Sequence, residues 1–334
     1  MASPRRLAPA ALLVVAALGH GECLRAQSAP RWIETWDRCV ASAKVDAKPI
    51  LLLVTAPEWD PGSRPFEQKV LGDTEVLRAI AAGYRPYRIE IAMRDDKKAR
   101  ALTDQERDLV RSLRFYGHQG LPRVILIDPG MHVYGRTGPV GTAEDFLAAL
   151  ADWEEARKTT LAPTVDEAAA ARYANDAAAS RNLKNPARAA DEAALAVKAD
   201  PRSPRAHFTL ALVLQDLGKL AEAKRSYFAA LSLDCTGNPK DATSTIWAAG
   251  GWYNLGGMAL AQKQEAKAIF YMRENQRTDH RTDAPMLRVA ELHAAASRPE
   301  LGVEDYGELL SRDGLSPDWL KNYLALQDLA WKAK

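Results

Sequence analysis

The side chains best suited to covalent or metal chemistry are few in this chain, and they are scattered. The three cysteines, Cys23, Cys39 and Cys235, lie far apart along 334 residues, which excludes a disulfide-stapled scaffold. The six histidines are His20, His118, His132, His207, His280 and His293. None of them forms a close metal-ligand pair such as His-Glu-x-x-His. We therefore expect no bound metal and no cofactor.

One short segment, 58–63, concentrates polar side chains directly after an apolar run. Asp60 and Ser63 stand three residues apart there. Together with His118 they would make a Ser–His–Asp set for nucleophilic catalysis. A simpler interpretation is that Asp60 or Ser63 caps a helix, with Pro61 in its first turn. We favour capping, and we expect Trp59 to be a core or groove aromatic residue.

The elements that must position this segment alternate between strand-like and helix-like patterns. The helix-like segments are 32–44, 64–71, 74–82, 103–115 and 142–158, and the strand-like segments are 49–55, 84–91, 123–127 and 132–136. The helix over 103–115 begins with Thr103-Asp104-Gln105-Glu106, which has the form of a capping box. Alternation of this kind predicts an α/β domain over residues 31–158.

Several of these segments, in this order, carry a family resemblance. Segments 48–59 and 66–76 resemble the strand, approach loop and following helix of thioredoxin-like proteins, and 120–122 with 124–130 resembles their cis-proline loop and next strand. The resemblance implies a thioredoxin-like fold, with Pro122 as the cis proline. In the family that loop also lines the groove that grips extended peptides.

The chain departs from the family at the positions that carry redox chemistry. The resemblance places Asp60 and Ser63 where family oxidoreductases carry the two cysteines of Trp-Cys-x-x-Cys, and Val54 where many carry a buried acid. Disulfide exchange needs a low-pKa thiolate to attack and a second thiol to resolve the mixed disulfide. Cys39 lies on the apolar face of the first helix, as a small buried hydrophobic residue would. We therefore expect no thiol–disulfide exchange.

The second half of the chain changes character to alanine-rich helical pattern with a period of 34 residues. Ala177, Ala189, Ala196 and Pro201 recur 34 residues later as Ala211, Ala223, Ala230 and Cys235. Gly218 stands between the two helices of the second unit and corresponds to Lys184 in the first. This register resembles tetratricopeptide (TPR) repeats over 170–203 and 204–237. Residues 159–169 form the expected linker.

Further units follow with less regular sequences. An insertion over 236–248 precedes a third repeat at 249–282, which opens with Trp252-Tyr253-Asn254-Leu255-Gly256 and has Ala268 at the required position. A degenerate pair over 284–312 and a capping helix over 316–332 complete the 170–334 region. Terminal units of such stacks are often atypical because they cover the end of the core.

A stack of this kind leaves a concave face lined by the first helix of each hairpin, which suits peptides or extended protein segments. The polar residues that we expect on that face are Arg172, Asn175, Arg181, Arg205 and Asn254. We therefore expect a protein or peptide partner.

The N-terminus has the pattern of an export signal. Arg5 and Arg6 precede an apolar run over 7–18 that is too short to span a bilayer, and cleavage sites follow Ala26 or Ser28. We expect a signal peptide over 1–26 and a periplasmic or secreted protein, with an uncleaved membrane anchor as the alternative. The formal charge of +2 comes from that segment, so no basic excess favours nucleic acid.

These observations predict an exported, non-catalytic interaction scaffold. The first alternative is a protein related to thiol–disulfide oxidoreductases or isomerases with residual or altered activity. The second alternative is a hydrolase built on Asp60, Ser63 and His118.

Overall fold

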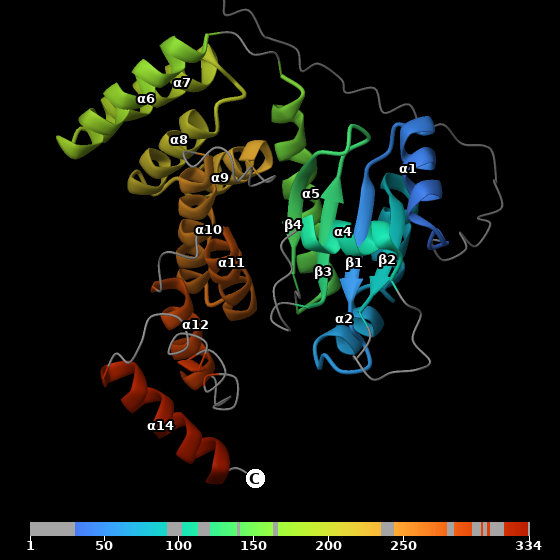
Figure 1. Ribbon diagram of the computed structural model, residues 1–334. Helices are drawn as coiled ribbons and strands as arrows, with labels where there is room; N and C mark the ends of the chain where they lie inside the picture. The colour runs from blue at the N-terminus through green and yellow to red at the C-terminus, as the bar shows by residue number, and fades with distance from the viewer. Residues whose placement is uncertain are drawn as a thin grey trace, which may run out of the picture.

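The computed structural model of this chain describes residues 31–91, 102–112, 121–138, 141–162, 166–234, 244–278, 284–295, 302, 306–307 and 317–332. Its described elements form two parts that lie against each other (Figure 1). We call the part from α1 to α5 the sheet unit and the part from α6 to α14 the helical stack. Cys235 and His118 lie outside the described residues, as does the expected signal segment 1–26 with its apolar run over 7–18.

The sheet unit is built on four strands in the order β2-β1-β3-β4. They are β1 (Ile50–Thr55), β2 (Arg85–Glu90), β3 (Arg123–Ile127) and β4 (Val133–Thr137). The two N-terminal strands run parallel, while β3 is antiparallel to β1 and β4 is antiparallel to β3. Every residue of β1 is buried, as a continuous apolar run between two covered faces requires.

Five helices cover the sheet. They are α1 (Trp36–Val45), α2 (Ser63–Lys69), α3 (Thr74–Gly83), α4 (Asp104–Ser112) and α5 (Ala143–Thr160). Because side chains alternate along a strand, Leu51 and Leu53 of β1 join the core shared with α2, α3 and α5. Leu52 and Val54 join the other core, with Cys39 of α1.

Local signals in the sequence account for where these helices begin. Glu106 accepts a hydrogen bond from the Thr103 backbone N–H at 2.8 Å, and its own N–H donates to the Thr103 hydroxyl at 3.2 Å, so the predicted capping box is confirmed. The helix predicted from Trp32 instead begins at Trp36. Ile33 is held in a parallel bridge to Tyr87 of β2, which keeps the preceding residues extended.

The helical stack consists of successive hairpins. The bounds are α6 (Glu167–Asn182), α7 (Pro186–Ala199), α8 (Pro204–Asp216), α9 (Leu220–Asp234), α10 (Ser244–Ala261), α11 (Glu265–Thr278), α12 (Ala284–Ala295) and α14 (Pro317–Lys332). The helices α6 and α7, α8 and α9, and α10 and α11 pair as hairpins, and α7 packs on α8 as α9 packs on α10. Small residues sit where the helices cross: Ala177, Ala189, Ala196, Ala211, Ala223, Ala230 and Ala268 are fully buried.

The three hairpin turns share one backbone geometry. Lys184, Gly218 and Lys263 follow the first helix of each hairpin, and all three have positive φ, at 56°, 73° and 58°. In each turn the next residue donates its N–H to a carbonyl five residues back, which is the Schellman motif.

The third hairpin begins earlier than the sequence predicts. The expected insertion over 236–248 overlaps α10, which already starts at Ser244. The physical reason is that Ala248 is already buried, and the half-buried Trp247 packs at a tilt against Phe208, with 5.4 Å between ring centroids.

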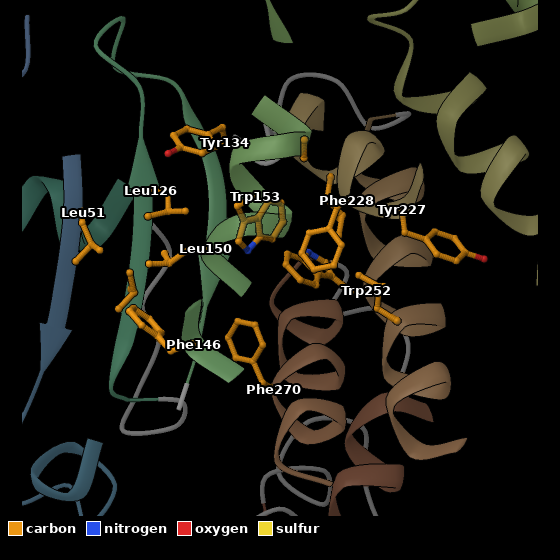
Figure 2. Packing of buried hydrophobic residues seen from close by; sticks show 14 of the residues in the cluster. Leu51, Leu126, Tyr134, Phe146, Leu150, Trp153, Tyr227, Phe228, Trp252 and Phe270 are labelled. Atoms are coloured by element: carbon orange, nitrogen blue, oxygen red, sulfur yellow. The ribbon is translucent and has the colours of Figure 1, made fainter. Parts of the chain in front are cut away.

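A continuous apolar core joins the sheet unit to the helical stack. Figure 2 shows Trp153 of α5 between the strands and the helices that carry Phe228, Trp252 and Phe270. Within the described part of the chain, ion pairs also cross this boundary, and the Ser232 hydroxyl of α9 donates to the Ala156 carbonyl of α5 at 3.1 Å. Asp145 pairs with Lys267 at 2.5 Å, Asp152 pairs with Lys224 at 2.6 Å, and Arg123 pairs with Glu274 at 3.0 Å. The α5 helix is therefore shared by both parts.

Candidate functional site

The first candidate site is the loop between β1 and α2, at the carboxyl end of β1. Its backbone folds back on Ala56, whose carbonyl accepts hydrogen bonds from the N–H groups of Trp59 at 3.2 Å and Asp60 at 2.8 Å. The Ser63 N–H donates to the Asp60 carbonyl at 3.2 Å. The loop is thus a compact double turn that fixes Asp60 next to Ser63.

The side chains of Asp60 and Ser63 are bound to each other. The Ser63 hydroxyl donates to Asp60 Oδ2 at 2.7 Å and accepts the Ala56 backbone N–H at 3.0 Å. Ser63 is fully buried. Both groups therefore satisfy polar atoms of the loop itself, which is what buried polar groups require.

The expectation that Asp60 or Ser63 caps the helix is wrong. The N-cap of α2 is Gly62, and no side chain makes a capping hydrogen bond there. Pro61 precedes the helix and is not part of its first turn. The reason is that the Ser63 hydroxyl accepts the Ala56 N–H and the Asp60 carboxylate accepts the Ser63 hydroxyl proton. Both side chains are therefore turned toward each other and do not bind the first N–H groups of the helix.

Pro122 lies against this loop. The Leu121–Pro122 peptide bond is cis. A Cβ placed on Gly62 would stand 3.4 Å from the Leu121 carbonyl oxygen and 3.5 Å from the Pro122 ring. The sequence segments 58–63 and 121–122 therefore meet, and they do so at the end of β1 next to the start of β3.

Trp59 packs beside the same loop. Its indole N–H donates to the carbonyl of Ile91 at 2.9 Å, and its ring packs on the core that contains Leu121. Trp59 is half-buried, so it supports the loop while one side stays open to solvent.

The chemistry of this loop follows from its donors. The Asp60 carboxylate accepts the proton of the Ser63 hydroxyl, but Ser63 is fully buried, whereas a nucleophile must be open to its substrate. Cys39 is fully buried on α1, and burial raises the pKa of its thiol to about 12. It contacts the Arg85 carbonyl, at the start of β2, whereas the loop follows Thr55 at the far end of β1. Five residues of strand, roughly 17 Å, separate the two.

The second candidate site lies on the first helices of the hairpins. Arg205 of α8 donates a hydrogen bond to Asn175 of α6, and its guanidinium lies 5.5 Å from the ring centroid of Trp247 on α10. These three residues link three successive first helices. Two of the expected groove residues, Asn175 and Arg205, are therefore brought together.

The other expected groove residues are placed differently. Arg172 lies over the ring of its neighbour Tyr173, at 5.0 Å. Asn254 donates to the Gly250 carbonyl of its own helix at 2.8 Å and does not join Arg205. Arg181 forms an ion pair with Asp216 of α8 at 2.5 Å.

Sequence reasoning missed the apolar part of this face. Ile246 and Tyr253 of α10 are 51% and 47% exposed, on the same side as Gly250. The ring of half-buried Phe208 from α8 fills the space over Gly250, where a Cβ would stand 2.7 Å from it. The spacing of 246, 250 and 253 puts them on one helix face and is the signal that was available. We call Asn175, Arg205, Phe208, Ile246, Trp247 and Tyr253 the first-helix face.

Other features of the described residues add no third site. A cavity of about 410 Å³ lies between the segment 31–34, α1 and the start of β2, and its Arg38 and Arg85 are paired with Glu34 and Asp46. Within the described part of the chain no three His, Cys, Asp or Glu side chains are grouped to hold a metal ion. Over the same residues, no helix has the length and apolar character needed to cross a membrane.

Comparisons with known proteins give only distant similarities. No family model and no curated protein matches this chain. A solved structure titled DsbH oxidoreductase is 16% identical and has a TM-score of 0.32, over 37% of this chain and 83% of its own. The MamA protein is 16% identical with a TM-score of 0.38, over 48% and 80%. PilF of Pseudomonas aeruginosa is 19% identical with a TM-score of 0.27, over 49% and 88%.

Proposed function

We propose that this chain is an exported, non-catalytic interaction scaffold. In this proposal the sheet unit is a thioredoxin-like domain without its redox cysteines, and the helical stack is a set of TPR-like repeats that binds a protein or peptide partner. The observation that carries it is the contrast between the two candidate sites. The loop at Asp60 is closed on itself, whereas the first-helix face presents two exposed apolar side chains, Ile246 and Tyr253, beside the half-buried Arg205.

The chemistry of the first-helix face suits an extended protein segment. Exposed Ile246 and Tyr253 offer apolar contact, and Arg205 offers hydrogen-bond donors for a backbone carbonyl or a carboxylate. Aromatic residues and arginine dominate the energetics of most protein interfaces. The face extends over α6, α8 and α10, so a bound segment would lie across several hairpins.

Site-specific photo-crosslinking tests this proposal in the cells that make the protein. A crosslinking amino acid at Tyr253 should capture a defined partner, and Arg205→Glu should reduce that capture. A crosslinker at Leu183, which is 81% exposed at the end of α6 and does not belong to the first-helix face, is the control. Equal capture of the same partner from both positions, or capture unaffected by Arg205→Glu, would count against the face.

The runner-up is residual thiol–disulfide activity, which the arrangement of Trp59, the loop and cis Pro122 favours by analogy alone. A turnover assay for disulfide reduction separates the two. We expect no activity above buffer. Activity that disappears in Cys39→Ser would overturn the non-catalytic proposal.

Restoring the missing thiols probes whether the loop still has the geometry of its proposed relatives. Asp60→Cys with Ser63→Cys should give a pair that oxidises and reduces reversibly, since both positions lie at the same turn. A pair that never forms a disulfide under mild oxidation would contradict the thioredoxin-like assignment of this loop.

Fractionation of the producing cells tests export: the mature protein should be found outside the cytoplasm.

A further inference from the structure

The last helix, α14, is attached to the stack by one face only. Leu326 is 6% exposed and packs with Tyr323 against a small core. The other members of that core are Met286, Leu287, Ala290 and Tyr306. Figure 1 shows α14 at the end of the stack, away from the sheet.

A second side of α14 carries a stripe of four residues, three of them apolar, of which Leu320 is half-buried and Leu324 and Trp331 are exposed. Leu320, Leu324, Gln327 and Trp331 follow one another at spacings of four, three and four residues, which places them in one stripe along the helix. Leu324 is 53% exposed and Trp331 is 82% exposed. A helix that only capped the stack would be expected to present a polar outer face.

The spacing of the stripe suits another helix as its partner. Apolar residues alternating at three and four form the seam of a two-helix coiled coil, because this spacing keeps one side of each helix toward the other.

The charges beside the stripe favour a second copy of α14 as that helix. Lys321 and Asp328 lie on the same side of the seam, seven residues apart. When two copies of α14 run antiparallel, Lys321 of one copy faces Asp328 of the other, and the pair occurs twice about a two-fold axis. Asp328 also binds Lys332 of its own helix at 2.5 Å, which leaves a carboxylate shared between two lysines.

We propose that α14 is a self-association surface through which two copies of this chain form an antiparallel dimer. The helix has 16 residues and is about 24 Å long. Two helices of this length bury less surface area than the roughly 1,200–2,000 Å² of a standard interface. We therefore expect a weak and reversible dimer. The proposal does not depend on the partner of the first-helix face, but a dimer would carry two such faces and gain avidity for a repeated or elongated partner.

Sedimentation velocity of the full chain, from low micromolar to several hundred micromolar, tests the dimer. The weight-average mass should rise toward that of two chains. Leu324→Lys and Trp331→Gln should each raise the dissociation constant about tenfold or more, because both side chains lie in the seam. Leu329→Lys is the matched control, since Leu329 is 54% exposed on α14 but lies off the stripe. It should leave the dissociation constant unchanged.

A charge exchange tests the antiparallel arrangement. Lys321→Glu should weaken the dimer about threefold by placing like charges together, and adding Asp328→Lys should restore it. Circular dichroism checks that each variant keeps its helix content. A monomer at every concentration, association that survives both seam substitutions, or equal loss with Leu329→Lys would each overturn the proposal.

Discussion

The indole of Trp153 packs edge-on against the ring of Phe228, with 4.5 Å between ring centroids and an interplanar angle of 78°. Trp153 belongs to α5 of the sheet unit and Phe228 to α9 of the helical stack. Both are almost completely buried, so neither part keeps a complete core without the other. The described parts of the sheet unit and the helical stack therefore share one packed core.

We expect Trp153→Ala to lower the free energy of unfolding by about 4 kcal/mol, because it removes a large side chain from a filled core. Hydrogen exchange should then show loss of protection in both β1 and α9. Leu183→Ala, at an exposed turn, should change stability by less than about 0.5 kcal/mol. Loss of protection confined to one part would contradict the shared core.

The ion pair between Arg123 and Glu274 also joins the sheet unit to the helical stack. The side chains are only 5% and 0% exposed, and Arg123 directly follows Pro122. Glu274→Gln should cost about 3 kcal/mol in chemical denaturation, because it removes one charge of an ion pair that is buried on both sides. Asp152→Asn removes the partner of the more exposed Lys224 and should cost less than about 1 kcal/mol. Similar costs for the two variants would contradict the role of burial.

Much of the architecture could be predicted from local patterns, and the exceptions have physical reasons. The run of Leu51–Leu53 and the capping box at Thr103 depend on neighbouring residues, so each was readable in the sequence. The partner of Ser63 was not, because its hydroxyl binds Ala56, seven residues back, in place of the helix that it begins. The Arg123–Glu274 pair joins residues far apart in the chain, and no periodicity in either segment signals it.

The candidate sites show the same division. The resemblance located the loop at Trp59, Asp60 and Pro122, while the first-helix face was anticipated only through its polar members. Ile246 and Trp247 were assigned to an insertion, because the sequence before them, 236–243, has no helical spacing of apolar residues that would indicate where the helix begins.

The repeated turn geometry leads to a prediction about stability. Lys184 and Lys263 hold a left-handed backbone conformation that favours glycine, as Gly218 does at the equivalent position. Lys184→Gly and Lys263→Gly should each stabilise the protein by up to about 1 kcal/mol in thermal or urea unfolding. Gly218→Ala should destabilise it by a similar amount, although its Cβ would meet no other atom. Gly257→Ala, at an open position inside a helix, should do the opposite and stabilise.

His207 makes stability depend on pH in mildly acidic solution. Burial holds the pKa of His207 below its ordinary value of 6.5, against the opposing effects of the Pro201 carbonyl and Asp200. In the neutral imidazole, Nε2 donates to the Pro201 carbonyl at 2.9 Å. As the pH falls below 6.5, the unfolded chain takes up a proton before the folded chain does, so the free energy of unfolding falls. The loss levels off once the folded histidine is protonated as well.

Urea denaturation across this pH range, with native protein and His207→Gln side by side, measures the contribution. The native protein should lose more stability than the variant between about pH 7 and about pH 5. The difference between the two curves is the informative quantity, because carboxylates such as Asp145, whose pKa is lowered by its hydrogen bond to Lys267, affect both proteins equally at lower pH. Parallel curves would mean that His207 is protonated to the same extent in the folded and unfolded chains, which its buried position argues against.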